Sequence, residues 1–152
     1  MIAGGAGDDA AVAARLAGYF SALSRADLDR LADHYAADAH FKDPFNAVDG
    51  LPAIRAIYAH MFAQLDAPRF EIHDALAGPG RCALTWTMHF RRRGAATGAP
   101  AQQIRGATLL HLDAAGRITL HRDYWDPAEE LYEGLPVLGT VLRAIKRRLA
   151  TP

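Results

Sequence analysis

The amino-acid sequence predicts a single α+β domain of 152 residues. In roughly the first 65 residues, apolar side chains recur at the spacing of a helical face. Between residues 70 and 125 the pattern changes to an alternation of apolar and polar side chains, interrupted by turn residues, which is typical of antiparallel hairpins. A chain of this length fits one hydrophobic core. Helices that precede a run of strands indicate a layered α+β architecture.

Three helices and one short strand are expected in the first half. Residues 10–23 form the first helix, with an apolar face made by Val12, Leu16, Tyr19, Phe20 and Leu23. Asp27 is the expected N-cap of a short second helix, whose inner face is Leu28, Leu31 and Tyr35. A short strand follows over residues 40–43. Gly50 and Pro52 mark the start of a third helix that reaches Leu65.

Two hairpins are expected in the second half. The first joins residues 70–77 to 82–91 through the turn at 78–80, which reads Gly-Pro-Gly. The second joins residues 103–113 to 117–125. The sequence therefore places four strands in succession after the helices.

The two ends of the chain lie outside this pattern. Residues 1–9 are rich in Gly and Ala and are expected to form a loose tail, so the domain proper spans residues 10–126. Residues 127–152 carry a helical apolar stripe with four basic residues mostly off it. Such a helix can lie on a membrane surface, but a core-facing stripe is more common. We therefore expect a helical extension that packs on the domain and borders the mouth of its pocket.

Composition narrows the function classes. The 17 basic and 17 acidic residues balance, so no nucleic-acid or membrane partner is expected. Cys82 is the only cysteine, which suits a reducing compartment. No signal-peptide pattern is present at the N-terminus, and the expected location is cytoplasmic. The seven histidines show no metal-ligand spacing and no glycine loop could cradle a phosphate, so neither a metal nor a cofactor is expected.

Several polar side chains fall on faces that should be buried. Three tyrosines share helical faces with apolar residues: Tyr19, Tyr35 and Tyr58. Each is either a core tyrosine whose hydroxyl bonds to the backbone, or a member of a hydrogen-bonded chain of hydroxyl groups. Asp43 lies at a strand end, before Pro44. It is either a cap of the following turn or a general base in a water-poor pocket.

The last strand carries a second polar group. Alternation places His121, Asp123 and Trp125 on one face of that strand. An earlier strand has its large apolar side chains, Trp86, Met88 and Phe90, on one face, which marks that face as the interior one. If Trp125 shares this interior face, His121 and Asp123 are also inside, as a structural hydrogen-bonded pair or as part of a site.

These residues occur in two stretches that resemble a known superfamily. The segment GYFSALSRADLDRLADHYAADAHFKDPFNAVDGLPAIRAIYAHM and the ending GRITLHRDYWD are similar to the nuclear transport factor 2-like superfamily, in its SnoaL-like and ketosteroid isomerase-like branch. The resemblance covers residues 12–126. It implies a cone-shaped fold, with a strongly curved, mainly antiparallel sheet wrapped around the N-terminal helices and an internal pocket for an apolar small molecule.

The resemblance also implies roles for individual residues. Ketosteroid isomerases use an aspartate base and an oxyanion hole made by a tyrosine and a protonated aspartate. The base falls on Asp43, the oxyanion tyrosine on Tyr19, and the two tyrosines that support it on Tyr35 and Tyr58. The protonated aspartate falls on Thr108, which is a departure because a threonine hydroxyl is a weaker donor.

Asp123 falls where SnoaL-like cyclases and limonene-epoxide hydrolases carry an acid. The Arg-x-Asp partner of those hydrolases falls within residues 84–88, where this chain reads Leu-Thr-Trp-Thr-Met. This chain therefore lacks most of the catalytic residues of those hydrolases.

The sequence thus favours a cofactor-independent enzyme that moves a proton next to a carbonyl on an apolar cyclic substrate. Asp43 would be the base and Tyr19 the donor to the oxyanion. His121 and Asp123 would position the substrate or a water, while the walls would be Trp86, Met88, Phe90 and Trp125. The alternative is a non-catalytic ligand-binding or assembly domain of the same fold. A homodimer is expected through the outer face of the sheet, which would carry Thr85, Thr87, His89, Arg105, Leu109 and His111.

Overall fold

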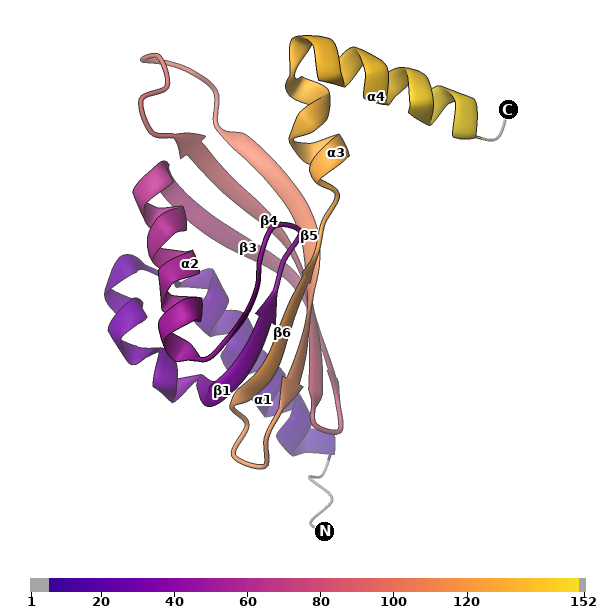
Figure 1. The fold of residues 1–152 in the computed structure, drawn as a ribbon. Helices are drawn as coiled ribbons and strands as arrows, with labels where there is room; N and C mark the ends of the chain where they lie inside the picture. The colour runs from indigo at the N-terminus through magenta and orange to yellow at the C-terminus, as the bar shows by residue number, and fades with distance from the viewer. Residues whose placement is uncertain (1–5, 151–152) are drawn as a thin grey trace.

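A computed structural model describes residues 6–150 of the chain (Figure 1). The first half contains α1 (Ala6–Ser21), the 3-10 helix η1 (Arg25–Asp33), β1 (Tyr35–Lys42), β2 (Ala47–Asp49) and α2 (Leu51–Gln64). Four long strands follow: β3 (Leu65–Gly78), β4 (Arg81–Arg92), β5 (Gln102–Leu112) and β6 (Ile118–Tyr124). The chain ends with α3 (Pro127–Glu130), the 3-10 helix η2 (Tyr132–Gly134) and α4 (Pro136–Leu149).

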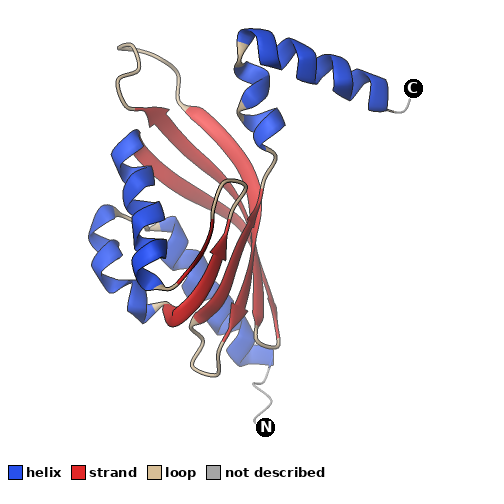
Figure 2. Ribbon diagram, viewed as in Figure 1, coloured by secondary structure: helices blue, strands red, loops and turns tan. Residues whose placement is uncertain are grey.

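The six strands form one curved sheet in the order β2-β1-β6-β5-β4-β3. All neighbouring pairs are antiparallel except β1 and β6, which run parallel. The helices α1 and α2 lie on the same side of this sheet, so its inner face is covered (Figure 2). The predicted α+β fold with a curved, mainly antiparallel sheet around N-terminal helices is confirmed.

The core lies between these helices and the inner face of the sheet. Strand β4 shows the alternation that the sequence predicts, because Leu84, Trp86, Met88 and Phe90 are all buried. From the helices, the core receives Leu16 and Phe20 of α1 and Ile54, Tyr58 and Phe62 of α2.

The segment after α1 differs from the sequence prediction in two ways. Ser24, rather than Asp27, is the N-cap of η1, and Asp27 reaches back three residues to accept hydrogen bonds from the Ser24 amide and hydroxyl at 2.8 and 2.7 Å. These bonds lower the pKa of the Asp27 carboxyl. Tyr35 is the first residue of β1 and not part of a helix, although it is buried as expected.

The ends of the chain also differ from expectation. Helix α1 begins at Ala6, within the expected tail, and residues 1–5 of that tail lie outside the described residues. The expected C-terminal helix is broken into α3, η2 and α4, since Gly134 and Pro136 interrupt it. Helix α4 extends away from the sheet (Figure 1), and its apolar side chains are exposed instead of packed on the domain. No helix within residues 6–150 is long and apolar enough to cross a membrane.

Candidate functional site

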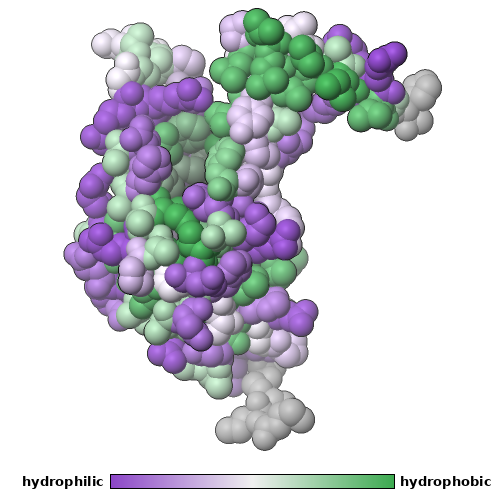
Figure 3. All heavy atoms as spheres, viewed as in Figure 1, coloured by the Kyte–Doolittle hydropathy of each residue, from purple (hydrophilic) through white to green (hydrophobic). Residues whose placement is uncertain are grey.

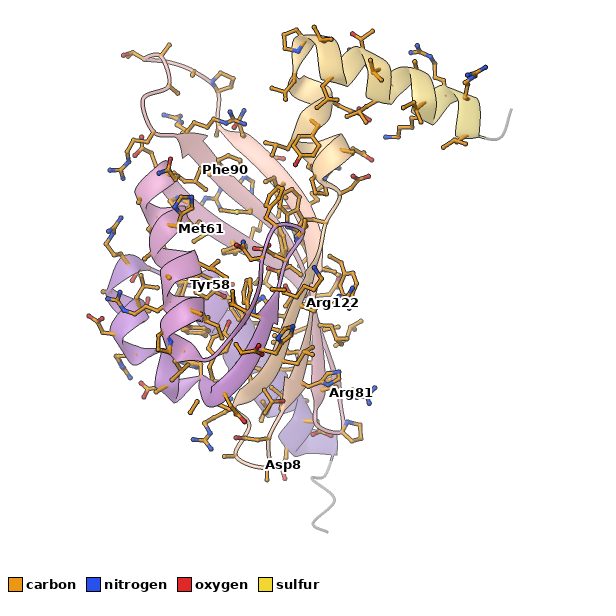
Figure 4. The ribbon with its side chains drawn as sticks, in the orientation of Figure 1. Asp8, Tyr58, Met61, Arg81, Phe90 and Arg122 are labelled. Atoms are coloured by element: carbon orange, nitrogen blue, oxygen red, sulfur yellow. The ribbon has the colours of Figure 1, made fainter. Side chains whose placement is uncertain are left out.

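An apolar cavity of about 300 Å³ lies between α2 and the inner face of the sheet. Tyr58 and Met61 face it from α2, and Phe90 faces it from β4 (Figure 4). Figure 3 shows the molecule hollowed between α2 and the segment that leads into α3. The remaining apolar walls are Phe41, Phe45, Ile57, Leu65, Phe70, Trp86, Met88, Ile104, Trp125 and Leu131. All four aromatic and sulfur-containing walls expected from the sequence therefore line one cavity.

A chain of buried polar side chains ends at this cavity. The hydroxyl groups of Tyr58 and Tyr35 lie 2.9 Å apart, and the Tyr35 hydroxyl lies 2.8 Å from Nδ1 of His121. Nε2 of His121 lies 2.8 Å from Oδ1 of Asp123. His121 is 3% exposed, and its neighbour Phe41 packs against the imidazole ring. The chain therefore joins α2 to strands β1 and β6.

The same carboxylate oxygen is held from its other side by β5. Thr108 and Asp123 are directly opposite each other in the β5–β6 pairing, and the Thr108 hydroxyl donates to Oδ1 of Asp123 at 2.5 Å. The indole Nε1 of Trp86 donates to the Thr108 hydroxyl oxygen at 2.8 Å. Thr108 and Trp86 are each 5% exposed, so each group relies on a partner inside the protein.

With Asp123 as a carboxylate and His121 as a neutral imidazole, the direction of every bond follows. An ionised carboxylate only accepts, so Nε2 of His121 donates to it and Nδ1 accepts from the Tyr35 hydroxyl. Tyr35 has one hydroxyl proton, so Tyr58 must donate to Tyr35. Both branches thus converge on Oδ1 of Asp123. Within residues 6–150, no hydrogen bond reaches Oδ2 of Asp123. This oxygen is not fully buried, so it stays accessible.

The two tyrosines of this hydrogen-bonded chain, Tyr35 and Tyr58, are held in their neutral form. Burial raises the pKa of Tyr35 and of Tyr58 well above the ordinary tyrosine value. A neutral hydroxyl can both donate and accept, which the chain requires of Tyr35. Among the described residues that line the cavity, only Tyr58 carries a hydroxyl group.

A second, much smaller chamber of about 30 Å³ lies at the inner end of the site. It shares Tyr58, Trp86 and Asp123 with the main cavity and is also lined by Thr108 and His121. Its volume suits a molecule of the size of water. The carboxylate of Asp123 therefore stands between the apolar cavity and a small chamber that has both apolar and polar walls.

Asp43 lies at the edge of the cavity, but its carboxylate caps a turn. Oδ1 accepts from the backbone amides of Phe45 and Asn46 at 2.7 and 2.6 Å. The side-chain amide of Asn46 donates to both carboxylate oxygens at 3.0 Å. This is the capping alternative that the Asp-Pro sequence allows. Both oxygens are engaged, which does not leave Asp43 poised as a base.

Tyr19 is not part of the hydroxyl chain and does not line the cavity. Its ring stacks on the imidazole of His34 with centroids 3.7 Å apart. The hydroxyl oxygen is buried without a hydrogen-bond partner among the described residues. Burial raises its pKa strongly. The expected contact of Tyr19 with Tyr35 and Tyr58 is absent from residues 6–150.

A wider groove of about 570 Å³ lies on the outside of the same region. Charged side chains line it, namely Lys42, Asp43, Arg122, Asp123 and Asp126. An apolar ligand gains little from such a surface, so the enclosed cavity is the better candidate site. Within the described part of the chain, no group of three or more His, Cys, Asp or Glu side chains is arranged to hold a metal ion.

The model of the SnoaL-like domain matches residues 16–121, which is more than half of the chain. The chain belongs to the SnoaL-like family. The match ends at His121, so Asp123 lies two residues beyond it. No curated protein sequence matches this SnoaL-like protein.

Solved structures with the same fold share between 13% and 22% of their residues with this SnoaL-like chain. An LEH-like epoxide hydrolase from M. tuberculosis is 22% identical, with a TM-score of 0.65 over 90% of this chain and 97% of that one. A hypothetical protein from Catenulispora acidiphila, with a ketosteroid isomerase-like fold and in complex with trimethylamine, is 20% identical; its TM-score is 0.67 over 82% and 93%. These likenesses support the fold.

Two residues of the SnoaL-like site were not anticipated from the sequence. Asn46 locks the Asp43 carboxylate, and the turn-forming order Asp-Pro-x-Asn is a local signal for it. Gly106 lies beneath the Trp86 ring, since a Cβ atom there would meet Cη2 of Trp86 at 2.6 Å. A glycine inside a strand indicates such a close approach.

Proposed function

We propose that this protein is a cofactor-independent enzyme that moves a proton next to a carbonyl group on an apolar, cyclic small molecule, with Asp123 as the general base. One observation carries the proposal: Oδ1 of Asp123 is held by Thr108 and His121, while Oδ2 has no partner among the described residues and Asp123 lines an apolar cavity. A base needs an accessible lone pair in a fixed position.

The proposed reaction uses groups that line the cavity. Oδ2 of Asp123 takes a proton from the carbon next to the carbonyl, and the C–H electron pair forms the enolate, with negative charge on the carbonyl oxygen. Asp123 then returns the proton to a different carbon, so that the substrate is isomerised and the enzyme is restored. Tyr58 supplies the hydroxyl that donates to the enolate oxygen once its proton turns from Tyr35 to the substrate, while Tyr35 keeps its hydrogen bond to His121.

Two other residues keep the base in place. Asp123 becomes neutral when it accepts the proton, and the hydrogen bond from His121 holds its Oδ1 throughout. Thr108 supports the same oxygen from β5. The sequence proposes Asp43 as the base and Tyr19 as the oxyanion donor. We assign these roles to Asp123 and Tyr58 instead, because Asp123 and Tyr58 line the cavity.

The experiment is deuterium exchange next to the carbonyl of a panel of cyclic enones and β,γ-unsaturated ketones, followed by NMR. We expect exchange with the wild type and a loss of about 10³-fold or more with Asp123→Asn. Tyr58→Phe should weaken it by about 10²-fold to 10³-fold. Asp43→Asn is the matched control, because asparagine can also cap the turn and exchange should persist.

A second candidate reaction is the activation of water by Asp123. The small chamber of about 30 Å³ beside Asp123, Thr108 and His121 favours it. Hydrolysis or hydration would place oxygen from ¹⁸O-labelled water in the product, which isomerisation would not. A cavity that binds members of the panel without exchange or ¹⁸O uptake would favour a non-catalytic binding domain.

A further inference from the structure

The exposed apolar side chains of the described residues gather on the last helix. Six of the nine large hydrophobic side chains that are exposed lie between residues 135 and 149. Figure 3 shows them as a continuous apolar surface along α4. They are Leu135, Val137, Leu138, Val141, Ile145 and Leu149. An apolar surface of this kind usually marks an interaction site.

Helix α4 turns its polar side toward the protein and its apolar side away from it. Lys146 donates to the carboxylates of Glu129 and Glu133 at 3.1 and 3.4 Å, and Arg143 donates to the backbone carbonyl of Glu133 at 2.7 Å. A surface helix ordinarily does the opposite. The contacts with α3 and η2 therefore leave the apolar face for another occupant.

A glycine allows this orientation. A Cβ atom on Gly139 would lie only 2.1 Å from the backbone oxygen of Glu133, so the helix approaches η2 more closely than any other residue type would allow. Gly139 is buried by this contact. The direction of α4 is thus set by backbone packing together with the polar contacts of Arg143 and Lys146.

The charge of α4 indicates what kind of partner binds its apolar face. All charged side chains of Pro136–Leu149 are basic: Arg143, Lys146, Arg147 and Arg148. Among residues 6–150, Arg147 and Arg148 make no ion pair. Two copies of this helix packed in parallel through their apolar faces would bring Arg148 of each copy, which makes no ion pair within residues 6–150, close together, whereas an anionic surface would attract it.

We propose that α4 binds the surface of an anionic lipid bilayer. The face formed by Leu138, Val141 and Ile145 enters the boundary between headgroups and acyl chains. Arg148, two turns after Val141, reaches the lipid phosphates from the edge of that face, and Arg147 on the opposite side adds longer-range attraction. Leu131 lines the cavity, and Leu131 and Leu135 line a further pocket of about 400 Å³ that shares Phe90 and Arg92 with it, so the segment that carries α4 begins at the edge of the cavity. Binding at α4 therefore brings that edge close to the bilayer.

The test is co-sedimentation of the full chain with phosphatidylcholine vesicles that contain or lack phosphatidylglycerol. We expect binding to the anionic vesicles that is at least about tenfold stronger than to the neutral ones and that weakens with added salt. Ile145→Glu and the pair Arg147→Glu, Arg148→Glu should each reduce binding by about tenfold or more. Leu76→Glu is the matched control, because Leu76 is a large apolar side chain of β3 that is 64% exposed.

Circular dichroism and thermal melting would establish that each variant folds, which is expected because Ile145 is 50% exposed. The proposal is overturned by equal binding to both kinds of vesicle, or by undiminished binding of Ile145→Glu. It is also overturned if neither vesicle binds and light scattering reveals a dimer that Ile145→Glu dissociates, since the occupant is then a second copy.

Discussion

Replacement of Thr108 by valine tests whether the polar chain around Asp123 contributes to stability. Valine has nearly the shape of threonine, so the change removes two hydrogen bonds without opening a cavity. A hydrogen bond to a charged group contributes about 1.5–3 kcal/mol, and a buried donor left without a partner costs about 1–3 kcal/mol. Both apply here, because Thr108 donates to Asp123 and accepts from the buried indole of Trp86. The expected loss is about 3 kcal/mol or more.

The assay is urea unfolding followed by circular dichroism. Thr108→Ser keeps the hydroxyl and should cost only about 1 kcal/mol for the lost methyl group. Trp86→Phe should cost less in the Thr108→Val background than in the wild type, since its indole N–H has already lost its acceptor. A loss below about 1 kcal/mol for Thr108→Val, or equal costs for Trp86→Phe in both backgrounds, would show that the hydrogen bonds of Thr108 with Asp123 and Trp86 are not formed.

Three further outcomes are expected. Gly106→Ala should destabilise the protein by about 1–3 kcal/mol, because the new methyl group would overlap the Trp86 ring; urea unfolding measures it, and an unchanged midpoint would contradict the contact. The contribution of the buried tyrosines to stability should be constant up to pH 10.0 and fall above it, because the unfolded chain then releases tyrosine protons that Tyr19, Tyr35 and Tyr58 retain when folded; unfolding midpoints across this range measure it, and an equally steep fall in the Tyr35→Phe, Tyr58→Phe double variant would contradict the assignment. Light scattering after size exclusion should reveal a homodimer through the outer face of the sheet, and a species of 16.4 kDa alone would contradict it.

The inner face of the sheet was predictable because strand alternation is a local property. Once Trp86, Met88 and Phe90 are taken as interior, the two-residue period places His121 and Asp123 inside as well, and the structure has them there. The hydrogen bond between Thr108 and Asp123 was not predictable in this way. It depends on the register between β5 and β6, which the sequence pattern leaves open.

Tyr19 and Asp43 show where pattern alone is insufficient. Helical spacing places Tyr19 on an apolar face, but the stacking of its ring on His34 is a tertiary contact between α1 and the segment after η1. Asp43 has a local competitor for its carboxylate, because the backbone amides of the turn and Asn46 lie within three residues. These local and tertiary contacts explain why neither residue is placed for the proton transfer expected of it.

The direction of α4 also depends on contacts that a periodic pattern does not contain. The sequence predicts that the apolar stripe from Leu131 to Leu149 packs on the domain, and of this stripe Leu131 lines the cavity. The close approach of Gly139 to Glu133, together with the ion pairs of Lys146, places the polar side inward instead. A stripe at helical spacing identifies an apolar face without identifying what covers it.

The most direct test of the central claim is deuterium exchange on the ketone panel by the Asp123→Asn and Asp43→Asn variants, measured side by side. We predict that exchange is lost with Asp123→Asn and retained with Asp43→Asn. Exchange that survives Asp123→Asn and disappears with Asp43→Asn would contradict the assignment of the base to β6.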